Sequence, residues 1–311
     1  MNLSDFSTWE VIYFLIICDD QYPCYIITWD DMNEDLFIRS STSSSSQRII
    51  VVDQNGKGDS ITVQGAVDKV PSQNLQRVII YIHPGIHREK AHIPASKPFS
   101  SLVGDQNQTA RTIISSHDKA SDTDQYSSIL GTSRSATLTV ESDYFCTTGI
   151  TIANTIIPDP KGVGMQAMAS RLTGDRAVLY RVRILGSQHT LLDDNCTLYS
   201  VAKGYGAIAA QHRNSANQDT GFSSVNCKIS GSGSLFEQRL GRVFKNDIFG
   251  ICDIDDIIDP KGSTDWNQPS RRQGNGANRA GRVAWSKTLN DSEAQPFWDV
   301  KFIGGHQWLR L

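Results

Sequence analysis

The chain has 311 residues, of which 39% are hydrophobic and 20% charged, a balance that fits a folded soluble protein and excludes a disordered one. Its net charge of -3 excludes a general electrostatic attraction to nucleic acid or to a membrane surface. The seven histidines and six cysteines form no group at metal-ligand spacing and include no CxxC pair. We therefore expect neither a metal site nor a disulfide framework, with one or two disulfide bridges left open.

Residues 1–47 differ from the rest of the chain. The apolar run Val11–Cys18 has the length of the hydrophobic region of a signal peptide and is too short to cross a bilayer. Acidic residues precede it, although an ordinary secretory signal begins with Lys or Arg. The stretch Ser40–Ser46 is typical of a linker. We predict an N-terminal extension with a weak signal segment at 1–47 and one folded domain at 48–311.

From residue 48 onward, short apolar stretches alternate with turn residues. One helix is predicted here, capped by Ser60 and ending before Pro71. Its apolar stripe consists of Ile61, Val63, Ala66, Val67 and Val70. Short strands are predicted at 49–52, 77–83, 102–104, 112–114, 136–140 and 147–153. Strands therefore dominate this half of the domain.

The second half continues the same pattern. The run Val182–Gly186 alternates apolar and polar residues and stops at a glycine, and a similar ending returns at 300–305. Further strands are predicted at 206–211 and 221–229, a loop at 271–281 and a short helix at 291–294. Strand-and-glycine units that repeat without helices between them are typical of an all-β solenoid. A β-sandwich is the alternative, but the paired hairpin turns that join its strands are missing from this sequence.

Several longer segments carry a resemblance to a known family. They are DQNGKGDSITVQGAVDKVP at 53–71, GMQAMASRLTGDRAVLYRVRILGSQHTL at 164–191, GYGAIAAQHR at 204–213, DIIDPKG at 256–262 and GANRAGRVAWSKTLNDSEAQPF at 276–297. In this order they make the chain resemble the plant pectinesterases, the pectin methylesterases of cell walls. The resemblance implies a right-handed parallel β-helix, secretion to the wall and hydrolysis of galacturonate methyl esters in homogalacturonan. It implies a monomer that needs no metal or organic cofactor. The partners it implies are pectin and a proteinaceous pectinesterase inhibitor.

The resemblance also implies a site of two carboxylates, two glutamines and an arginine. One Asp attacks the ester carbonyl, a second protonates the departing methanol and then activates water, and the glutamines stabilise the oxyanion. Gln166 and Gln188 match the glutamines, and Arg242 matches the arginine that orients the nucleophile. Phe244 stands where the family has a sugar-stacking Trp, and Arg171 is a candidate to bind a galacturonate carboxylate. Three neighbouring arginines could do the same or form a solvated basic face: Arg176, Arg181 and Arg183.

The carboxylates are where the chain departs from the family. His189 replaces the acid/base Asp, and the nucleophile motif is missing at the junction of Asp194 and Asn195, where the family has about one further coil. His189 could serve as a general base, and Asp193 or Asp194 could approach the site if the short coil shifts its register. A second gap falls near Pro269–Gly276.

A solenoid tolerates the loss of a whole coil better than a globular core does, because each coil contacts only its neighbours. The sequence therefore predicts a pectinesterase-family hydrolase in which the fold persists and the catalytic carboxylates are lost. The competing hypothesis is an inactive protein that binds pectin or a pectinesterase inhibitor. A polysaccharide lyase is a third and weaker one, because lyases usually recruit calcium through clustered carboxylates and no such cluster stands out.

Overall fold

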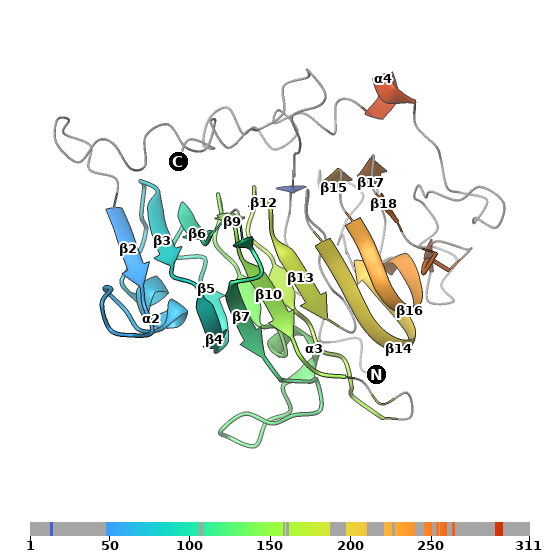
Figure 1. Ribbon diagram of the computed structural model, residues 1–311, viewed down its shortest axis with the longest axis horizontal. Helices are drawn as coiled ribbons and strands as arrows, with labels where there is room; N and C mark the ends of the chain where they lie inside the picture. Colours follow the sequence, from blue (N-terminus) through green and yellow to red (C-terminus); the bar gives the residue numbers. More distant parts are fainter. Residues whose placement is uncertain are drawn as a thin grey trace.

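The computed structural model describes residues 13–14, 48–105, 108–157, 159, 162–186, 197–209, 221–225, 228–239, 246–250, 253–254, 256–259, 263–264 and 290–294. Strands dominate these residues, and the strands of successive coils lie side by side (Figure 1). The pairs of neighbouring strands run parallel throughout the sheets. None of the helices in this part of the chain is both long enough and apolar enough to cross a bilayer.

Three sheets form the sides of a solenoid. The long sheet contains β4 (Gly85–Arg88), β7 (Thr112–Ser116), β10 (Thr151–Asn154), β13 (Arg183–Gly186), β14 (Thr197–Ala209), β16 (Lys228–Arg239) and β18 (Asp253–Ile254), with β19 (Ser263–Thr264) beside β16. The short sheet contains β5 (Ala91–Ile93), β8 (Leu138–Val140) and β11 (Ser170–Leu172). The third sheet contains β2 (Arg48–Val52), β3 (Val78–Ile82), β6 (Ser100–Val103), β9 (Cys146–Thr148) and β12 (Val178–Tyr180). The coils that begin at β4, β7 and β10 run from the long sheet to the short sheet and the third sheet, and then return one strand further along the long sheet.

A row of aligned aliphatic positions runs along the long sheet. Strand pairing aligns Ile114, Ile152, Ile184, Leu198 and Ile229, which we call the isoleucine ladder. Its four isoleucines are each at most 1% exposed. Complete burial of one such side chain stabilises a fold by roughly 1.5–3 kcal/mol, and β-branched residues suit the pleated surface. The alternation seen in the sequence is therefore the core face of the long sheet.

Helix α2 (Val63–Asp68) begins two residues later than predicted. Thr62, and not Ser60, is its cap, because the Thr62 hydroxyl accepts a hydrogen bond from the Gly65 N–H at 3.0 Å. Ser60 still belongs to the extended chain, where it bridges to Val52. Ile61 therefore lies outside the helix and is 61% exposed, so its place in the predicted stripe is wrong. The other four members of the stripe are buried as predicted: Val63, Ala66, Val67 and Val70.

Side chains from the first coil hold both ends of α2. The Glu89 carboxylate accepts hydrogen bonds from the backbone N–H groups of Val63 and Gln64 at 2.8 and 2.9 Å. The Lys97 ammonium donates to three carbonyls at the other end, at 2.8–2.9 Å, those of Val67, Asp68 and Val70. A carboxylate at a helix N-terminus and an ammonium at its C-terminus both satisfy orphan backbone groups and complement the helix dipole. The side chains of Glu89 and Lys97, which lie on either side of β5, thus fix both ends of α2.

Two strands predicted as continuous are in fact pairs of strands. Within 147–153, β9 ends at Thr148, Gly149 turns the chain with φ +70°, and β10 begins at Thr151 in a different sheet. Within 221–229, β15 (Gly221–Val225) ends two residues before β16 begins. A two-residue bend is too short to disturb the alternation by which the sequence predicts strands.

The short helix α4 (Asp291–Ala294) is as predicted, whereas α3 (Gly131–Arg134) was not predicted. The predicted loop at 271–281 lies outside the described residues.

The register of the long sheet gives the length of each coil. Residues paired across neighbouring strands are 27 positions apart from Gly85 to Thr112, 38 from Ile113 to Thr151, 32 from Thr151 to Arg183, 31 from Thr197 to Lys228 and 25 from Lys228 to Asp253. From Arg183 to Thr197 the separation along the sequence is only 14 positions. We call this interval the short coil. The connection of the short coil, residues 187–196, lies outside the described residues.

An N-terminal strand pairs with a strand of the second half of the chain. β15 and β17 (Asn246–Gly250) each precede a long-sheet strand by two residues, as β12 precedes β13, so they hold the third-sheet position in later coils. β1 (Tyr13–Phe14) pairs in parallel with β15, with Tyr13 opposite Gly221. In Figure 1 it is the small dark blue arrow between β12 and β15. Two residues of the predicted signal segment thus form the edge strand of the sheet that contains β15 and β17.

Candidate functional site

One corner of the solenoid contains two long connections. It lies between the ends of the long-sheet strands and the starts of the short-sheet strands, and we call it the corner. After β7 it contains residues 117–137, and after β10 the described part of 155–169. β13 ends at Gly186 at the same edge of the long sheet, one coil further on. The corner is therefore where the sequence following β13 begins.

Gln166, one of the two predicted oxyanion donors, lies in the corner and is half-buried. Its backbone carbonyl accepts a hydrogen bond from the Ala120 N–H at 2.7 Å, and the carbonyl of Gly164 accepts one from the Ser121 N–H at 2.9 Å. On the other side, the Met168 N–H donates to the Ser135 hydroxyl at 3.1 Å. The segment 164–168 is thus fixed along its backbone against the 117–137 connection.

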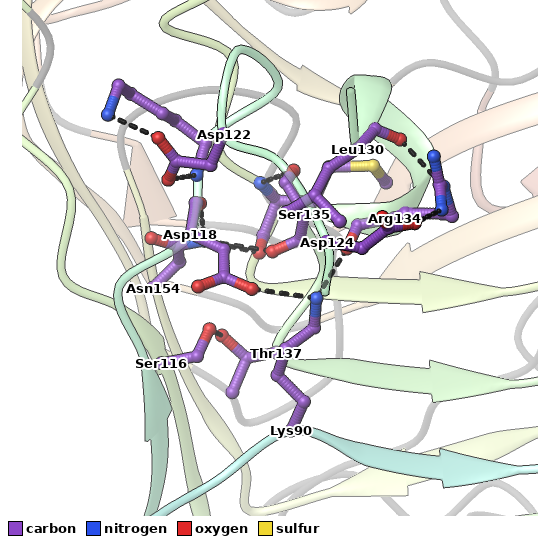
Figure 2. A network of polar contacts seen from close by, with 12 residues as sticks. Lys90, Ser116, Asp118, Asp122, Asp124, Leu130, Arg134, Ser135, Thr137 and Asn154 are labelled. Carbon is purple, nitrogen blue, oxygen red and sulfur yellow. Dashed lines mark hydrogen bonds and ion pairs between the residues drawn. The ribbon is translucent and has the colours of Figure 1, made fainter. Parts of the chain in front are cut away.

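Asn154, the last residue of β10, joins the three backbone segments of the corner (Figure 2). Its side-chain amide nitrogen donates to the carbonyls of Asp118 at 2.9 Å, Ser135 at 3.2 Å and Met168 at 3.0 Å. The Asn154 side-chain oxygen accepts from the Ile156 N–H at 3.2 Å. The residue is only 2% exposed, so these bonds replace water on every polar atom of its side chain.

Three ion pairs brace the 117–137 connection. Lys90 binds the carboxylate of Asp118 at 2.8 Å and also donates to the Arg134 carbonyl. A hydrogen bond from the Lys119 ammonium, together with the Lys119 N–H, lowers the pKa of Asp122. The Ser128 N–H and the Arg134 guanidinium lower the pKa of Asp124. Asp122 and Asp124 are therefore held in their charged form by partners within the connection itself.

The four arginines named in the sequence lie on different sides of the solenoid. Arg171 is in β11, on the short sheet, where its guanidinium faces Glu141 at 3.4 Å and its side chain is 18% exposed. Arg183 is in β13 of the long sheet. Arg176 and Arg181 flank β12 and stack over Tyr144 and Tyr180. They do not form one basic face, and Arg171 as a substrate ligand stays a prediction.

Most of the predicted site lies outside the described residues. These positions are Gln188, His189, Arg242 and Phe244, together with the alternative carboxylates Asp193 and Asp194. Gln166 and Arg171 are the two that the structure describes, and they lie five residues apart on one connection and its strand. Within the described part of the chain, no group of three His, Cys, Asp or Glu side chains could hold a metal ion.

Sequence reasoning missed Asn154 and Ser135. Both are buried polar residues, Asn154 at the end of β10 and Ser135 at the C-cap of α3, and each serves the backbone of a distant segment. An Asn that directly follows an apolar strand, as Asn154 follows Ile152 and Ala153, is the signal that could have indicated a buried amide. Its partners are 14 to 36 residues away, so periodicity could not identify them.

Comparisons with known proteins agree with this architecture. The model of the Pectinesterase family matches residues 49–199 and 194–306. Pectinesterase QRT1 of Arabidopsis thaliana is 46% identical over 306 residues, covering 86% of this chain and 80% of that protein. Pectinesterase 2 of Olea europaea is 28% identical, covering 95% of this chain and 93% of that protein.

Solved structures share the fold. The pectin methylesterase from carrot covers 86% of this chain and 97% of its own, with a TM-score of 0.67 at 24% identity. The pectin methylesterase PemA from Erwinia chrysanthemi gives a TM-score of 0.61 at 19% identity. The fold thus defines an all-β protein of the right-handed parallel β-helix class. With the family match and the similarity to QRT1, the chain belongs to the pectinesterase family.

Proposed function

We propose that this chain binds methyl-esterified homogalacturonan in the cell wall but hydrolyses its methyl esters at or near the background rate. The observation that carries the proposal is the short coil. Every other interval along the long sheet spans 25 to 38 residues, whereas Arg183 and Thr197 are 14 apart. The segment lost is the one that, by resemblance to the family, would carry the nucleophilic Asp.

Chain length supports this reading of the short coil. Ten residues, 187–196, separate β13 from β14. Strands of the short and third sheets have at least three residues. The shortest described connection has two residues from the long to the short sheet, five from the short to the third sheet, and two from the third sheet back to the long sheet. Two such strands with these three connections need fifteen residues. A coil of ten cannot visit both sheets in the way the preceding coils do.

The alignments support a loss of similar size. The match with QRT1 runs over 306 positions but covers 86% of 311 residues, which is about 267 residues. About 39 aligned positions of that relative therefore have no counterpart in this chain. The family match is also split into two parts that meet at residues 194–199, beside the junction of Asp194 and Asn195. The second gap, near Pro269–Gly276, stays a prediction.

The family's chemistry needs more than the groups that remain. In ester hydrolysis by a carboxylate, the nucleophile forms an acyl-enzyme, methanol leaves with a proton from the acid, and water then releases the acid product. Gln166, Gln188 and Arg242 are the groups we expect to bind the ester, with Phe244 against the sugar. His189 stands in the acid/base position. Asp122 and Asp124 are poor replacements for the nucleophile, because a lowered pKa accompanies lower basicity and both are held by cations.

The test measures binding and turnover separately. Titration calorimetry with a methyl-esterified galacturonan oligomer should detect binding that the variant Gln166→Ala weakens, while methanol release from methylated pectin stays at background. Inserting a coil from an active relative between Asp194 and Asn195, together with His189→Asp, should restore methanol release. The matched control is the same insertion with its nucleophilic Asp replaced by Asn.

Each outcome bears on a different part of the proposal. If the unmodified chain fails to bind the oligomer, pectin binding is wrong. If the unmodified chain turns over at a family rate, the loss of activity is wrong, and an esterase using His189 with Asp193 or Asp194 is the better account. The proposed partners are pectin and a proteinaceous pectinesterase inhibitor, and the proposed state is a monomer without a cofactor.

A further inference from the structure

A single buried amide connects both ends of the 117–137 connection to the segment that carries Gln166. The Asn154 amide nitrogen reaches the carbonyl of Asp118 at the start of that connection and that of Ser135 near its end. It also reaches the carbonyl of Met168, two residues after Gln166. No other side chain shown in the network donates to all three segments (Figure 2).

The chemistry of this position selects asparagine. Two N–H groups can serve three converging carbonyls only if one of the hydrogen bonds is shared, and the short side chain must end where the three segments meet. A carboxylate of the same shape would place a negative charge among carbonyl oxygens, and an apolar side chain would leave buried carbonyls unpaired. The hydrogen bond from the Asn154 amide to the Met168 carbonyl is the one that bears on the candidate site, because Met168 lies two residues after Gln166.

We propose that Asn154 is a positioning residue that sets the place of the Gln166 amide toward the ester carbonyl of methyl-esterified galacturonate. It acts on Gln166 through the backbone, since Met168 is held by Asn154 and Ser135 while Gln166 itself is held by Ala120. The inference rests on the proposed function, because it assumes that Gln166 contacts the bound ester.

The experiment is a double-mutant cycle on the full chain. Binding of a fully methyl-esterified galacturonan hexamer is measured by titration calorimetry for the unmodified chain, Asn154→Ala, Gln166→Ala and the double variant. We expect Asn154→Ala and Gln166→Ala each to weaken binding by about tenfold, the size of one hydrogen bond, and the double variant to be no weaker than Gln166→Ala alone. A purely structural role would instead give additive losses.

The matched control is Thr137→Val. The Thr137 hydroxyl is also buried and donates to the Ala153 carbonyl at 3.0 Å. Only the backbone N–H of Thr137, which the substitution keeps, donates to the Met168 carbonyl, at 3.3 Å. The Thr137→Val variant should have lower thermal stability and an unchanged affinity for the hexamer. A second variant, Asn154→Asp, should bind weakly at neutral pH and recover part of its affinity in acid, where a protonated carboxyl regains one donor. The ligand has no free carboxylates within its repeating units, so this recovery reports on residue 154.

Three results would overturn the inference: additive losses in the cycle, a Thr137→Val variant that binds as weakly as Asn154→Ala, or no acid recovery in Asn154→Asp. If the unmodified chain itself does not bind the hexamer, the proposed function fails instead. Hydrogen exchange then still decides the positioning role, because exchange at the Ala120 and Met168 amides should be faster in Asn154→Ala than in Thr137→Val. Equal exchange in the two variants would contradict it.

Discussion

Residues 48–186 and residues 197–264 extend the same long sheet with different support. In the first region, the coils that begin at β4, β7 and β10 each add a strand to all three sheets, and ion pairs and a buried amide fix the connections. In the second, the long sheet continues in register past the short coil, while β1 pairs with β15 and β15 pairs with β17 in a separate sheet. The isoleucine ladder crosses the boundary without interruption. One sheet can therefore carry the fold forward where a coil is incomplete.

The largest expected effect tests whether the ladder stabilises both regions equally. Ile152→Ala and Ile229→Ala each remove a fully buried side chain, one on each side of the short coil. Each should lower the free energy of unfolding by about 2–5 kcal/mol in denaturant titrations. The control Ile86→Ala, at a position 46% exposed, should change it by about 0.5 kcal/mol or less. A negligible cost at Ile229 alone would show that the second region does not continue the core.

Next in size is the capping of α2, which belongs to the first region alone. Glu89→Ala leaves the N–H groups of Val63 and Gln64 without their acceptor. We expect a loss of about 1–2 kcal/mol in the free energy of unfolding. Glu141→Ala, which removes a more exposed ion-pairing carboxylate, should cost about 0–1 kcal/mol. Equal costs for the two variants would contradict the capping role of Glu89.

The N-terminal strand offers a smaller effect confined to the second region. Tyr13→Pro removes the backbone N–H that a strand beside β15 uses in pairing. We expect a loss of about 1 kcal/mol in stability, with faster hydrogen exchange in β15 and unchanged exchange in β3 and β10. Ser44→Pro, in the predicted linker, is the control and should alter neither. Unchanged exchange in β15 would mean that β1 does not stabilise β15.

The smallest effect is the pH dependence of the 117–137 connection. Asp124 has a folded-state pKa below the ordinary value of 3.8, because the Ser128 N–H and Arg134 favour its carboxylate. Its stabilising contribution is present above pH 3.8 and is lost as the pH falls through the lower folded-state pKa. Asp124→Asn should therefore melt below the unmodified chain at pH 6 and converge with it in acid. A difference in melting temperature that persists at pH 2 would contradict this electrostatic origin.

Sequence alone predicted the fold further than it predicted the site. Alternation and glycine endings indicated a β-solenoid, since buried residues repeat along each strand, and Ile152 and Ile184 show that pattern plainly. The bend at Gly149 went unseen because two residues do not break the alternation. Asn154 was missed because its role depends on carbonyls brought together only by coil stacking. The short coil was indicated by motif order, and its strand register was visible only in three dimensions.

The central claim is that the short coil removes ester hydrolysis while the fold is retained. The most direct measurement is the initial rate of methanol release from highly methylated pectin by the purified 311-residue chain, beside an active relative with an intact coil at equal concentration. The account predicts a rate indistinguishable from that of buffer. A rate comparable to that of the relative would contradict it, and Asp193→Asn and Asp194→Asn would then identify the carboxylate responsible.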